Sequence, residues 1–321
     1  MPANAERDLL ARIPGVRVLV IGDAMLDRHL IGQADRISPE APVPIVRVTE
    51  RRITAGGAAN VATNVTAAGG SCTLVGVVGA DTAGTELRAT LQGARVRDLT
   101  QVVRDRPTTT KSRVVARGQQ VLRIDEERES PISAEDRALI AAAASDALAD
   151  ARVLVFEDYD KGVCTPPLIR LLLGAALQRG VPVVVDPKIR QFFDYAGATV
   201  FKPNRRELAA ALGPGTDLQN PVTLTRARER LDAEHLLVTL GSDGMVLAGP
   251  KGLLTRIPAR AREVFDISGA GDTVTAWVAM GIAAGGDMLT VARLAAAAAG
   301  VAVGKRGVAT VTTADVLAAL G

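Results

Sequence analysis

Short runs rich in Val, Leu and Ile alternate along this chain with longer, Ala-rich stretches. The runs expected to form strands are Arg17–Gly22, Thr73–Gly79, Arg152–Glu157, Val181–Val185, Thr199–Lys202 and Leu236–Leu240. The stretches expected to form helices are 57–68, 133–149, 165–179, 222–233, 270–284 and 287–303. Alternation of this kind predicts an α/β fold in which helices cover both faces of a parallel sheet. Ligands of such folds bind outside the carboxyl ends of the strands.

Two stretches, 33–50 and 107–125, break this alternation. They are rich in Val, Ile, Thr and Arg and have no obvious crossover helix. We interpret them as extra strands that form a small lid over the sheet edge, and ordinary surface hairpins are the alternative. No repeat or long flexible linker is visible, so we expect residues 1–321 to form a single domain with a lid.

Composition excludes several classes of function. The chain is 48% hydrophobic and only 2% aromatic, with a formal net charge of +3. Its basic residues are scattered and not interleaved with aromatic side chains, so we expect no nucleic-acid partner, whereas anionic small molecules remain candidates. Cys72 and Cys164 are too few for a disulfide framework, and we expect both to be reduced and buried. The N-terminus lacks the apolar core of a signal peptide and Arg293 interrupts the best apolar run, so we expect a cytoplasmic protein without a membrane partner.

The strongest motif is Asp266-Ile267-Ser268-Gly269-Ala270-Gly271-Asp272, which leads directly into an apolar helical stretch. Small residues at a helix start let backbone N–H groups point at an anion, and the helix dipole strengthens that attraction. An Asp in the first turn is often only a partner of the dipole. Beside an anion site, however, Asp272 stands where a general base facing a transferring phosphoryl group would stand.

Two other glycine motifs fail on inspection. The sequence that starts at Gly269 resembles a dinucleotide-binding fingerprint, but Val274 replaces its third glycine and the segment lies far from the first strand. The segment 300–306 resembles a P-loop, but it has one residue too few between its glycines and ends in Arg306 where Ser or Thr is required. A dinucleotide oxidoreductase is therefore disfavoured.

Two earlier motifs make the terminal one specific. Gly22-Asp23-Ala24-Met25-Leu26-Asp27 follows the first expected strand, and Ala55-Gly56-Gly57-Ala58-Ala59-Asn60 opens a helix. Together with the terminal motif, in this order and spacing, they resemble the pfkB (ribokinase-like) family of carbohydrate kinases across essentially the whole chain. The resemblance implies a three-layer α/β/α ribokinase-like fold with a mostly parallel central sheet and a small β-strand lid. It also implies an ATP-dependent enzyme that phosphorylates a sugar hydroxyl with the help of Mg²⁺.

The resemblance assigns roles to individual residues. The positions that match those holding the sugar hydroxyls are Asp27, Gly56, Gly57 and Asn60. Asp272 matches the catalytic base, and the anion hole for the transferred phosphoryl group matches Gly269, Ala270 and Gly271. Phosphoryl transfer depends mainly on positioning and charge neutralisation, which such groups supply.

The resemblance also implies nucleotide and metal positions. Asn204-Arg205-Arg206-Glu207 matches the family's N-x-x-E element, so Asn204 and Glu207 are expected to organise Mg²⁺ through water. Judged from the residues alone, this segment is an ordinary helix N-cap with an acidic first turn. The turn beneath the nucleotide is expected at Thr239, Gly241 and Gly244, with Lys305 also near the cofactor. A monovalent cation such as K⁺ is a further expectation, around Asp266 and residues 301–307.

Longer strings resemble one branch of the family, the D-glycero-β-D-manno-heptose 7-phosphate kinases. These strings are 25–28, 36–44, 110–113, 119–120, 123–125 and 158–162. The resemblance implies transfer to the anomeric 1-hydroxyl, which gives the 1,7-bisphosphate used in building the lipopolysaccharide inner core. Many such kinases are fused to a nucleotidyltransferase domain for which 321 residues leave no room, so we expect a separate enzyme for that step.

A substrate that already carries a phosphate needs cations away from Asp272. The candidate substrate-binding residues from the lid and the strand-end loops are Arg36, Lys111, Arg113, Gln120, Arg123, Asp158, Lys161 and Lys188, with Arg117 and Arg190 as further cations. Two alternatives stay open: another sugar kinase of the family, ribokinase- or fructokinase-like, or a non-catalytic sugar or nucleotide sensor on the same scaffold. Because lids of this family often pair across a dimer, the resemblance also implies a homodimer.

Overall fold

The chain folds around one long sheet. The structure is a computed structural model that describes residues 2–213, 216–218, 220–261 and 263–320. Its central sheet has nine strands in the order β15-β14-β13-β12-β11-β10-β1-β4-β6, parallel from β13 to β6 and antiparallel at β14 and β15. The strands are β1 Arg17–Gly22, β4 Ser71–Val75, β6 Arg97–Asp98, β10 Val153–Glu157, β11 Val183–Asp186, β12 Val200–Phe201, β13 His235–Thr239, β14 Met245–Ala248 and β15 Leu254–Ile257.

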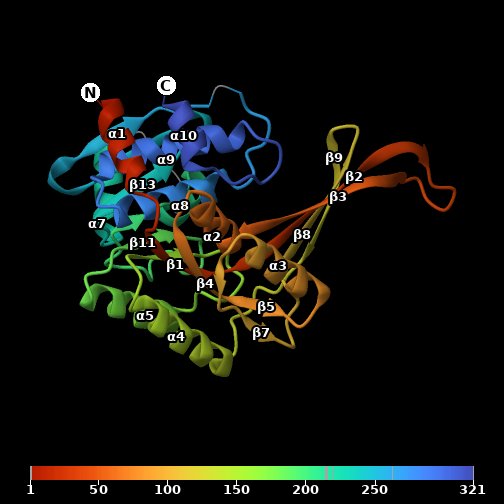
Figure 1. Ribbon diagram of the computed structural model, residues 1–321, viewed down its shortest axis with the longest axis horizontal. Coiled ribbons are helices and arrows are strands. Elements are labelled where there is room, and N and C mark those ends of the chain that lie inside the picture. The colour runs from red at the N-terminus through yellow and green to blue at the C-terminus, as the bar shows by residue number, and fades with distance from the viewer. Residues whose placement is uncertain (1, 214–215, 219, 262, 321) are drawn as a thin grey trace.

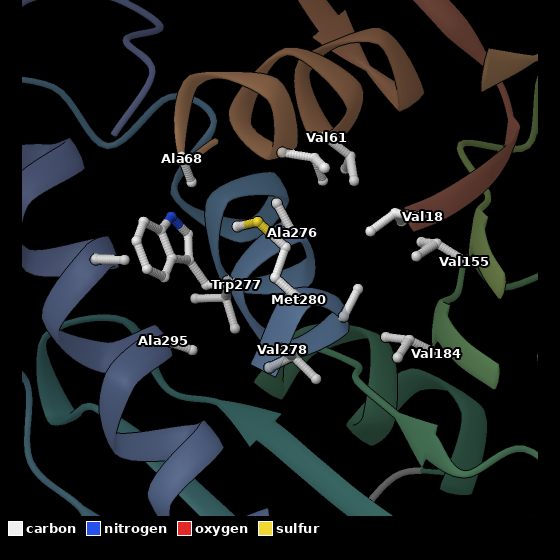
Figure 2. Close-up of a cluster of buried hydrophobic side chains, with 14 of the residues drawn as sticks. Val18, Val61, Ala68, Val155, Val184, Ala276, Trp277, Val278, Met280 and Ala295 are labelled. Carbon is white, nitrogen blue, oxygen red and sulfur yellow. The ribbon is translucent and has the colours of Figure 1, made fainter. Parts of the chain in front are cut away.

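Helices cover both faces of this sheet, because its inner strands are apolar on both sides (Figure 1). In β1, Val18 and Val20 join one hydrophobic cluster, and Leu19 and Ile21 join the other. The first cluster, part of which Figure 2 shows, packs under α1 Pro2–Ala11, α2 Ala58–Ala67, α3 Thr82–Gly93, α8 Ala270–Ala283, α9 Met288–Val303 and α10 Thr313–Ala319. The second packs under α4 Ala134–Leu148, α5 Pro166–Gln178, α6 Arg205–Leu212 and α7 Pro221–Arg230. This arrangement confirms the expected three-layer α/β/α fold.

The main difference from the sequence prediction concerns 73–79, expected as one strand. The structure ends β4 at Val75 and places β5 Val77–Gly79 in a separate two-stranded sheet with β7 Gln101–Val103. At Gly76 between them, a side chain would meet the Gly22 carbonyl oxygen at 2.6 Å, so the chain can turn away there only with glycine. The helices α1, α3 and α10 and the strands β14 and β15 were not predicted, since these segments are short or carry few buried apolar positions. Of α6, only the N-cap segment 204–207 was predicted.

A second sheet projects from the body (Figure 1). It has the order β3-β2-β8-β9, formed by β2 Ala24–Ile37, β3 Pro44–Gly57, β8 Thr110–Ala116 and β9 Gln119–Glu126. These strands overlap the two stretches interpreted as a lid, but β2 and β3 reach further toward the body than the expected limits of 33 and 50. The ends nearest the body are buried, which places Asp27 of β2 and Gly56 of β3 beside the central sheet.

The carboxyl ends of β1, β10 and β11 lie side by side in the central sheet. Asp23, Glu157 and Asp186 therefore meet at one edge, where the second sheet also begins. Of the helices that the structure describes, none is long and apolar enough to cross a membrane.

Candidate active site

The start of α8 carries the candidate base. Gly269 caps this helix with a left-handed backbone, φ 76°, and a side chain there would lie 2.7 Å from Asn60 Nδ2. The first turn of a helix leaves amide N–H groups without intrahelical partners, and here those groups belong to small residues, among them Ala270 and Gly271. Asp272 lies in this turn with only 4% of its surface exposed. The expected anion hole and base are therefore adjacent.

Both oxygens of Asp272 accept hydrogen bonds. Asn60 Nδ2 donates to Oδ2 at 2.7 Å, and the Tyr159 hydroxyl donates to Oδ1 at 2.7 Å. Burial raises the pKa of Asp272, while these two hydrogen bonds act in the opposite direction by favouring the carboxylate. The structure thus joins residues 60, 159 and 272, which come from α2, the loop after β10, and α8.

Asn60 is held in place by a second amide. Asn64 Nδ2, one turn later in α2, donates to Asn60 Oδ1 at 3.0 Å, and Val311 N donates to Asn64 Oδ1 at 3.2 Å. All of these groups are buried. A buried, satisfied chain of amides fixes which atom of Asn60 faces Asp272, so Asn60 is oriented as a donor.

The sugar-binding positions expected on β2 and β3 lie together. A side chain at Gly56 would meet Asp27 Oδ2 at 2.4 Å, and Gly57 has φ 53° with Asp23 O only 2.5 Å from a would-be Cβ. Gly56 therefore allows the backbone to approach the Asp27 carboxylate closely, and Gly57 allows it to approach the Asp23 carbonyl. Asp27 is 5% exposed and forms an ion pair with Arg113 of β8.

Asp23 organises the loop that follows β10, a role the sequence analysis did not assign. Its Oδ2 accepts the backbone N–H groups of Tyr159 at 2.8 Å and Lys161 at 2.9 Å, and its Oδ1 accepts that of Val163 at 3.2 Å. The neighbouring Asp158 accepts the Tyr195 hydroxyl, and burial raises the pKa of Asp158 to about 7. Asp158 is thus part of the loop's own framework.

Three buried carboxylates, those of Glu157, Asp186 and Asp272, lie at the strand ends with one oxygen of each within 4.8 Å of the others. Lys202 Nζ lies 2.8 Å from Asp186 Oδ2, and Thr275 donates to the same oxygen. Neither oxygen of Glu157 has a hydrogen-bond partner among the described residues, and burial, with its carboxylate neighbours, raises the pKa of Glu157 well above its usual range. Orphaned carboxylate oxygens suit a hard divalent cation such as Mg²⁺.

The predicted metal residues Asn204 and Glu207 have other partners. Asn204 Oδ1 caps α6, and Glu207 Oε2 accepts Asn204 N at 2.8 Å in a capping box. Glu207 Oε1 forms an ion pair with Lys188. The local reading of this segment as a helix N-cap is confirmed, and the metal role stays a prediction.

The expected nucleotide turn follows β13. Thr239 forms an isolated parallel bridge with Asn204, so the two predicted elements are adjacent. Gly241 has φ 64°, and Gly244 has φ 82° with Ile257 O 2.1 Å from a would-be Cβ. Nearby cations are paired: Arg205 with Asp243, and Lys305 with Asp315 at 2.9 Å. Arg206 is exposed.

The candidate phosphate-binding residues differ sharply in their surroundings. Several already have carboxylate partners: Arg113 with Asp27, Arg117 with Asp35, Arg123 with Asp125, Arg190 with Glu129, Lys161 with Glu127 and Glu129, and Lys188 with Glu207. Arg36 and Gln120 are exposed on the projecting sheet. Lys111 is half-buried, its Nζ lies 5.2 Å from the centre of the Tyr159 ring, and within the described parts of the chain it forms no ion pair. Burial lowers the pKa of Lys111, and the attraction of the Asp27 and Glu127 carboxylates only partly offsets this effect.

The sequence analysis assigned no role to Tyr159, Glu157, Asp186 or Lys202. Each follows a strand of the central sheet or ends it, and that position was the one available signal. The two cysteines are buried and free, as expected.

Known proteins resemble this chain in sequence and in fold. Residues 16–315 match the model of the pfkB family of carbohydrate kinases. A relative from Rhodospirillum rubrum, named Bifunctional protein HldE, is 41% identical over 99% of this chain, and one of the same name from Halorhodospira halophila is 47% identical over 96%. The chain spans 65% of the length of each of these relatives.

Solved structures resemble the fold with little sequence identity. The Arabidopsis thaliana ribokinase complexed with ribose and ATP has a TM-score of 0.72 at 22% identity, covering 95% of this chain and 99% of that one. Phosphofructokinase-2 from Escherichia coli, in complex with potassium, has a TM-score of 0.77 at 19% identity, covering 96% and 98%. From the family match over most of its length, this chain belongs to the pfkB family of carbohydrate kinases.

Proposed function

We propose that this protein transfers the γ-phosphoryl group of ATP to the anomeric 1-hydroxyl of D-glycero-β-D-manno-heptose 7-phosphate and so forms the 1,7-bisphosphate. The observation that carries the proposal is the buried carboxylate of Asp272 in the first turn of α8, hydrogen-bonded to Asn60 beside the cap glycine Gly269. The relatives named Bifunctional protein HldE and the strings shared with heptose 7-phosphate kinases support the choice of sugar.

Each group at the site has one task in this reaction. Asp27, Gly56, Gly57 and Asn60 orient the sugar, and Asp272 accepts the proton of the acceptor hydroxyl as its oxygen attacks phosphorus. The amide N–H groups at the start of α8 stabilise the charge on the transferred phosphoryl group. The segments 204–207 and 239–244 support the nucleotide from the neighbouring strand ends.

Mg²⁺ belongs to the proposal as the ion that neutralises phosphate charge during transfer. The donor set favours Glu157, whose oxygens have no hydrogen-bond partner among the described residues, and Asp186, whose partners Lys202 and Thr275 both contact Oδ2. In Asp272 and Glu207, by contrast, both oxygens already have partners. Glu207 then acts on the metal through water or through Lys188.

The metal assignment predicts different behaviour for two Glu→Gln variants. Glu157→Gln is expected to weaken Mn²⁺ binding, measured by electron paramagnetic resonance with nucleotide present, by at least about tenfold, because it removes a charged oxygen ligand. Glu207→Gln is the matched control. It keeps the carboxylates of both Glu157 and Asp186, so it is expected to weaken Mn²⁺ binding less. If Mn²⁺ affinity falls equally in the two variants, or falls more in Glu207→Gln, the 204–207 segment binds the metal instead.

Lys111 is the best candidate to bind the distal phosphate of the sugar. It is paired in register with Asp27 between β2 and β8, so it lies beside the expected sugar. Arg36 lies on the same strand as Asp27 but nine residues further out. At roughly 3.3 Å per residue that is about 30 Å along the strand, further than a seven-carbon sugar phosphate reaches. Within one subunit, Lys111 is the better candidate.

The pH dependence of turnover follows from the surroundings of Asp272. A general base works when deprotonated, and burial raises the pKa of this carboxyl. Activity is therefore expected to fall on the acid side at a pH above the ordinary Asp range of about 4. A pH profile of kcat with saturating substrates measures this limb, and a limb at or below pH 4 would contradict the assignment.

We also propose a cytoplasmic homodimer that pairs through the projecting sheet, and K⁺ as an activating ion near residues 266 and 301–307. Large apolar side chains of the sheet are exposed, including Ile37, Val121, Leu122 and Ile124. Sedimentation of the full chain tests the dimer, and replacing K⁺ by Na⁺ in the assay tests the ion.

The experiment that tests the function is a coupled ADP-release assay with heptose 7-phosphate, ATP and Mg²⁺. Phosphorus NMR of the product identifies the hydroxyl that was modified. Faster turnover of ribose or fructose would replace the heptose assignment by another sugar kinase activity. Binding of both ligands without product over hours would favour a sensor.

A further inference from the structure

The Tyr159 hydroxyl lies where an acceptor hydroxyl is required. A sugar hydroxyl must donate its proton to one oxygen of Asp272 as it attacks phosphorus. Oδ2 faces Asn60, which Asn64 and Val311 hold in place. Oδ1 accepts the Tyr159 hydroxyl at 2.7 Å. Since Tyr159 donates an O–H as a sugar does, it can stand in for the acceptor at Oδ1.

Two candidate substrate-binding cations hold the Tyr159 ring. Lys188 Nζ lies 4.5 Å and Lys111 Nζ lies 5.2 Å from the ring centre, within the range of cation–π attraction. Lys111 comes from the projecting sheet and Lys188 from the loop after β11. An anionic ligand attracts both ammonium groups and so competes with the ring for them. The backbone of Tyr159 is fixed by Asp23, so the side chain is the part that can respond.

We propose that Tyr159 occupies Oδ1 of Asp272 while the sugar is absent, and thereby keeps water out of the acceptor position and limits wasteful hydrolysis of ATP. The inference rests on the proposed role of Asp272 as base. Kinases must discriminate against water, which is smaller than the sugar and far more concentrated. A hydroxyl that cannot reach the phosphorus, hydrogen-bonded to the base, achieves this without a moving domain.

The reaction that Tyr159 suppresses is ordinary hydrolysis. The water oxygen forms a bond to the γ-phosphorus as the bond from that phosphorus to the β,γ-bridging oxygen breaks. ADP leaves with the electron pair, and the water proton passes to Asp272 Oδ1 and then to solvent. The products are ADP and inorganic phosphate, with no reactant besides ATP and water.

The test compares ATP hydrolysis without sugar to phosphoryl transfer with sugar in the full-length protein. Tyr159→Phe removes only the hydroxyl, and the ratio of hydrolysis to transfer is expected to rise at least about tenfold, within the range of general-base effects. Tyr195→Phe is the matched control, because Tyr195 is also buried and its hydroxyl bonds a carboxylate of the same loop, Asp158. Its ratio is expected to stay unchanged.

Adding Asp272→Asn to Tyr159→Phe is expected to abolish the extra hydrolysis. An unchanged ratio in Tyr159→Phe, an equal fall in both rates, or extra hydrolysis that survives the double substitution would overturn the inference. Failure of the proposed function is distinguishable, because it appears in the unsubstituted protein as absent transfer to heptose 7-phosphate. Failure of the base role appears as full transfer activity in Asp272→Asn alone. A thermal unfolding curve of each variant establishes that the comparison concerns folded protein.

Discussion

Asp272→Asn is expected to lower kcat by at least about 10²-fold while ATP and the sugar phosphate still bind, because the amide keeps the shape of the side chain but cannot accept the acceptor's proton. Both oxygens of Asp272 accept hydrogen bonds, and the substitution replaces one of them by an NH2 donor, so the hydrogen bonding with Asn60 or Tyr159 also changes. Separate measurement of kcat and of both dissociation constants isolates the chemical step.

Asp287→Asn is the matched control for this substitution. Asp287 also stands at a helix start, where its Oδ1 accepts Thr290 N at 3.0 Å, but it caps α9 and has no part in the site. Asn caps helices about as well as Asp, so little change is expected. Unimpaired turnover in Asp272→Asn would remove this residue from the mechanism as the catalytic base.

Lys111→Met is expected to raise the Michaelis constant for heptose 7-phosphate by about tenfold or more, with a smaller effect on kcat. A hydrogen bond to a charged group contributes about 1.5–3 kcal/mol, and the methionine side chain keeps most of the volume that packs near Tyr159. The loss should be specific to the phosphorylated sugar, since the unphosphorylated heptose has no distal anion to bind.

Arg36→Ala supplies the contrast. Arg36 is exposed on the outer part of β2. Within one subunit, its removal is therefore expected to change the Michaelis constant for heptose 7-phosphate little. If Lys111→Met affects both sugars equally, Lys111 supports the site without binding the phosphate. If only Arg36→Ala is specific for the phosphorylated sugar, the distal phosphate is bound on the projecting sheet.

Local sequence patterns predicted most of the strands and helices of the fold. Runs with an apolar centre, such as Arg152–Glu157, indicated strands buried on both faces, and the structure places β10 next to β1 in the central sheet. Helices and strands with weaker sequence patterns were not predicted. In α3 the buried side chains are few, including Leu87 and Leu91 on a largely polar helix, and the pattern is too sparse to detect.

Site residues divide in the same way. Asp272, Asn60 and Asp27 stand in short motifs whose spacing is local, so the sequence pointed to them directly. Glu157 stands in no such motif, and the string 158–162 gave Tyr159 no role of its own. The roles of both residues depend on Asp272, which is more than a hundred positions away. The ranking of the cations likewise required their partners, such as Asp125 for Arg123 and Glu127 for Lys161.

By itself the amino-acid sequence determined the layered α/β fold, the carbohydrate kinase family and the candidate base, because strand periodicity and glycine-rich helix starts are encoded by neighbouring residues. The tertiary structure alone decided which candidate cations already have ion-pair partners, which carboxylates converge and which hydroxyl bonds the base. Those properties depend on distances between residues far apart in the chain, because hydrogen bonds form only at about 3 Å and screened charges interact only within about 10 Å.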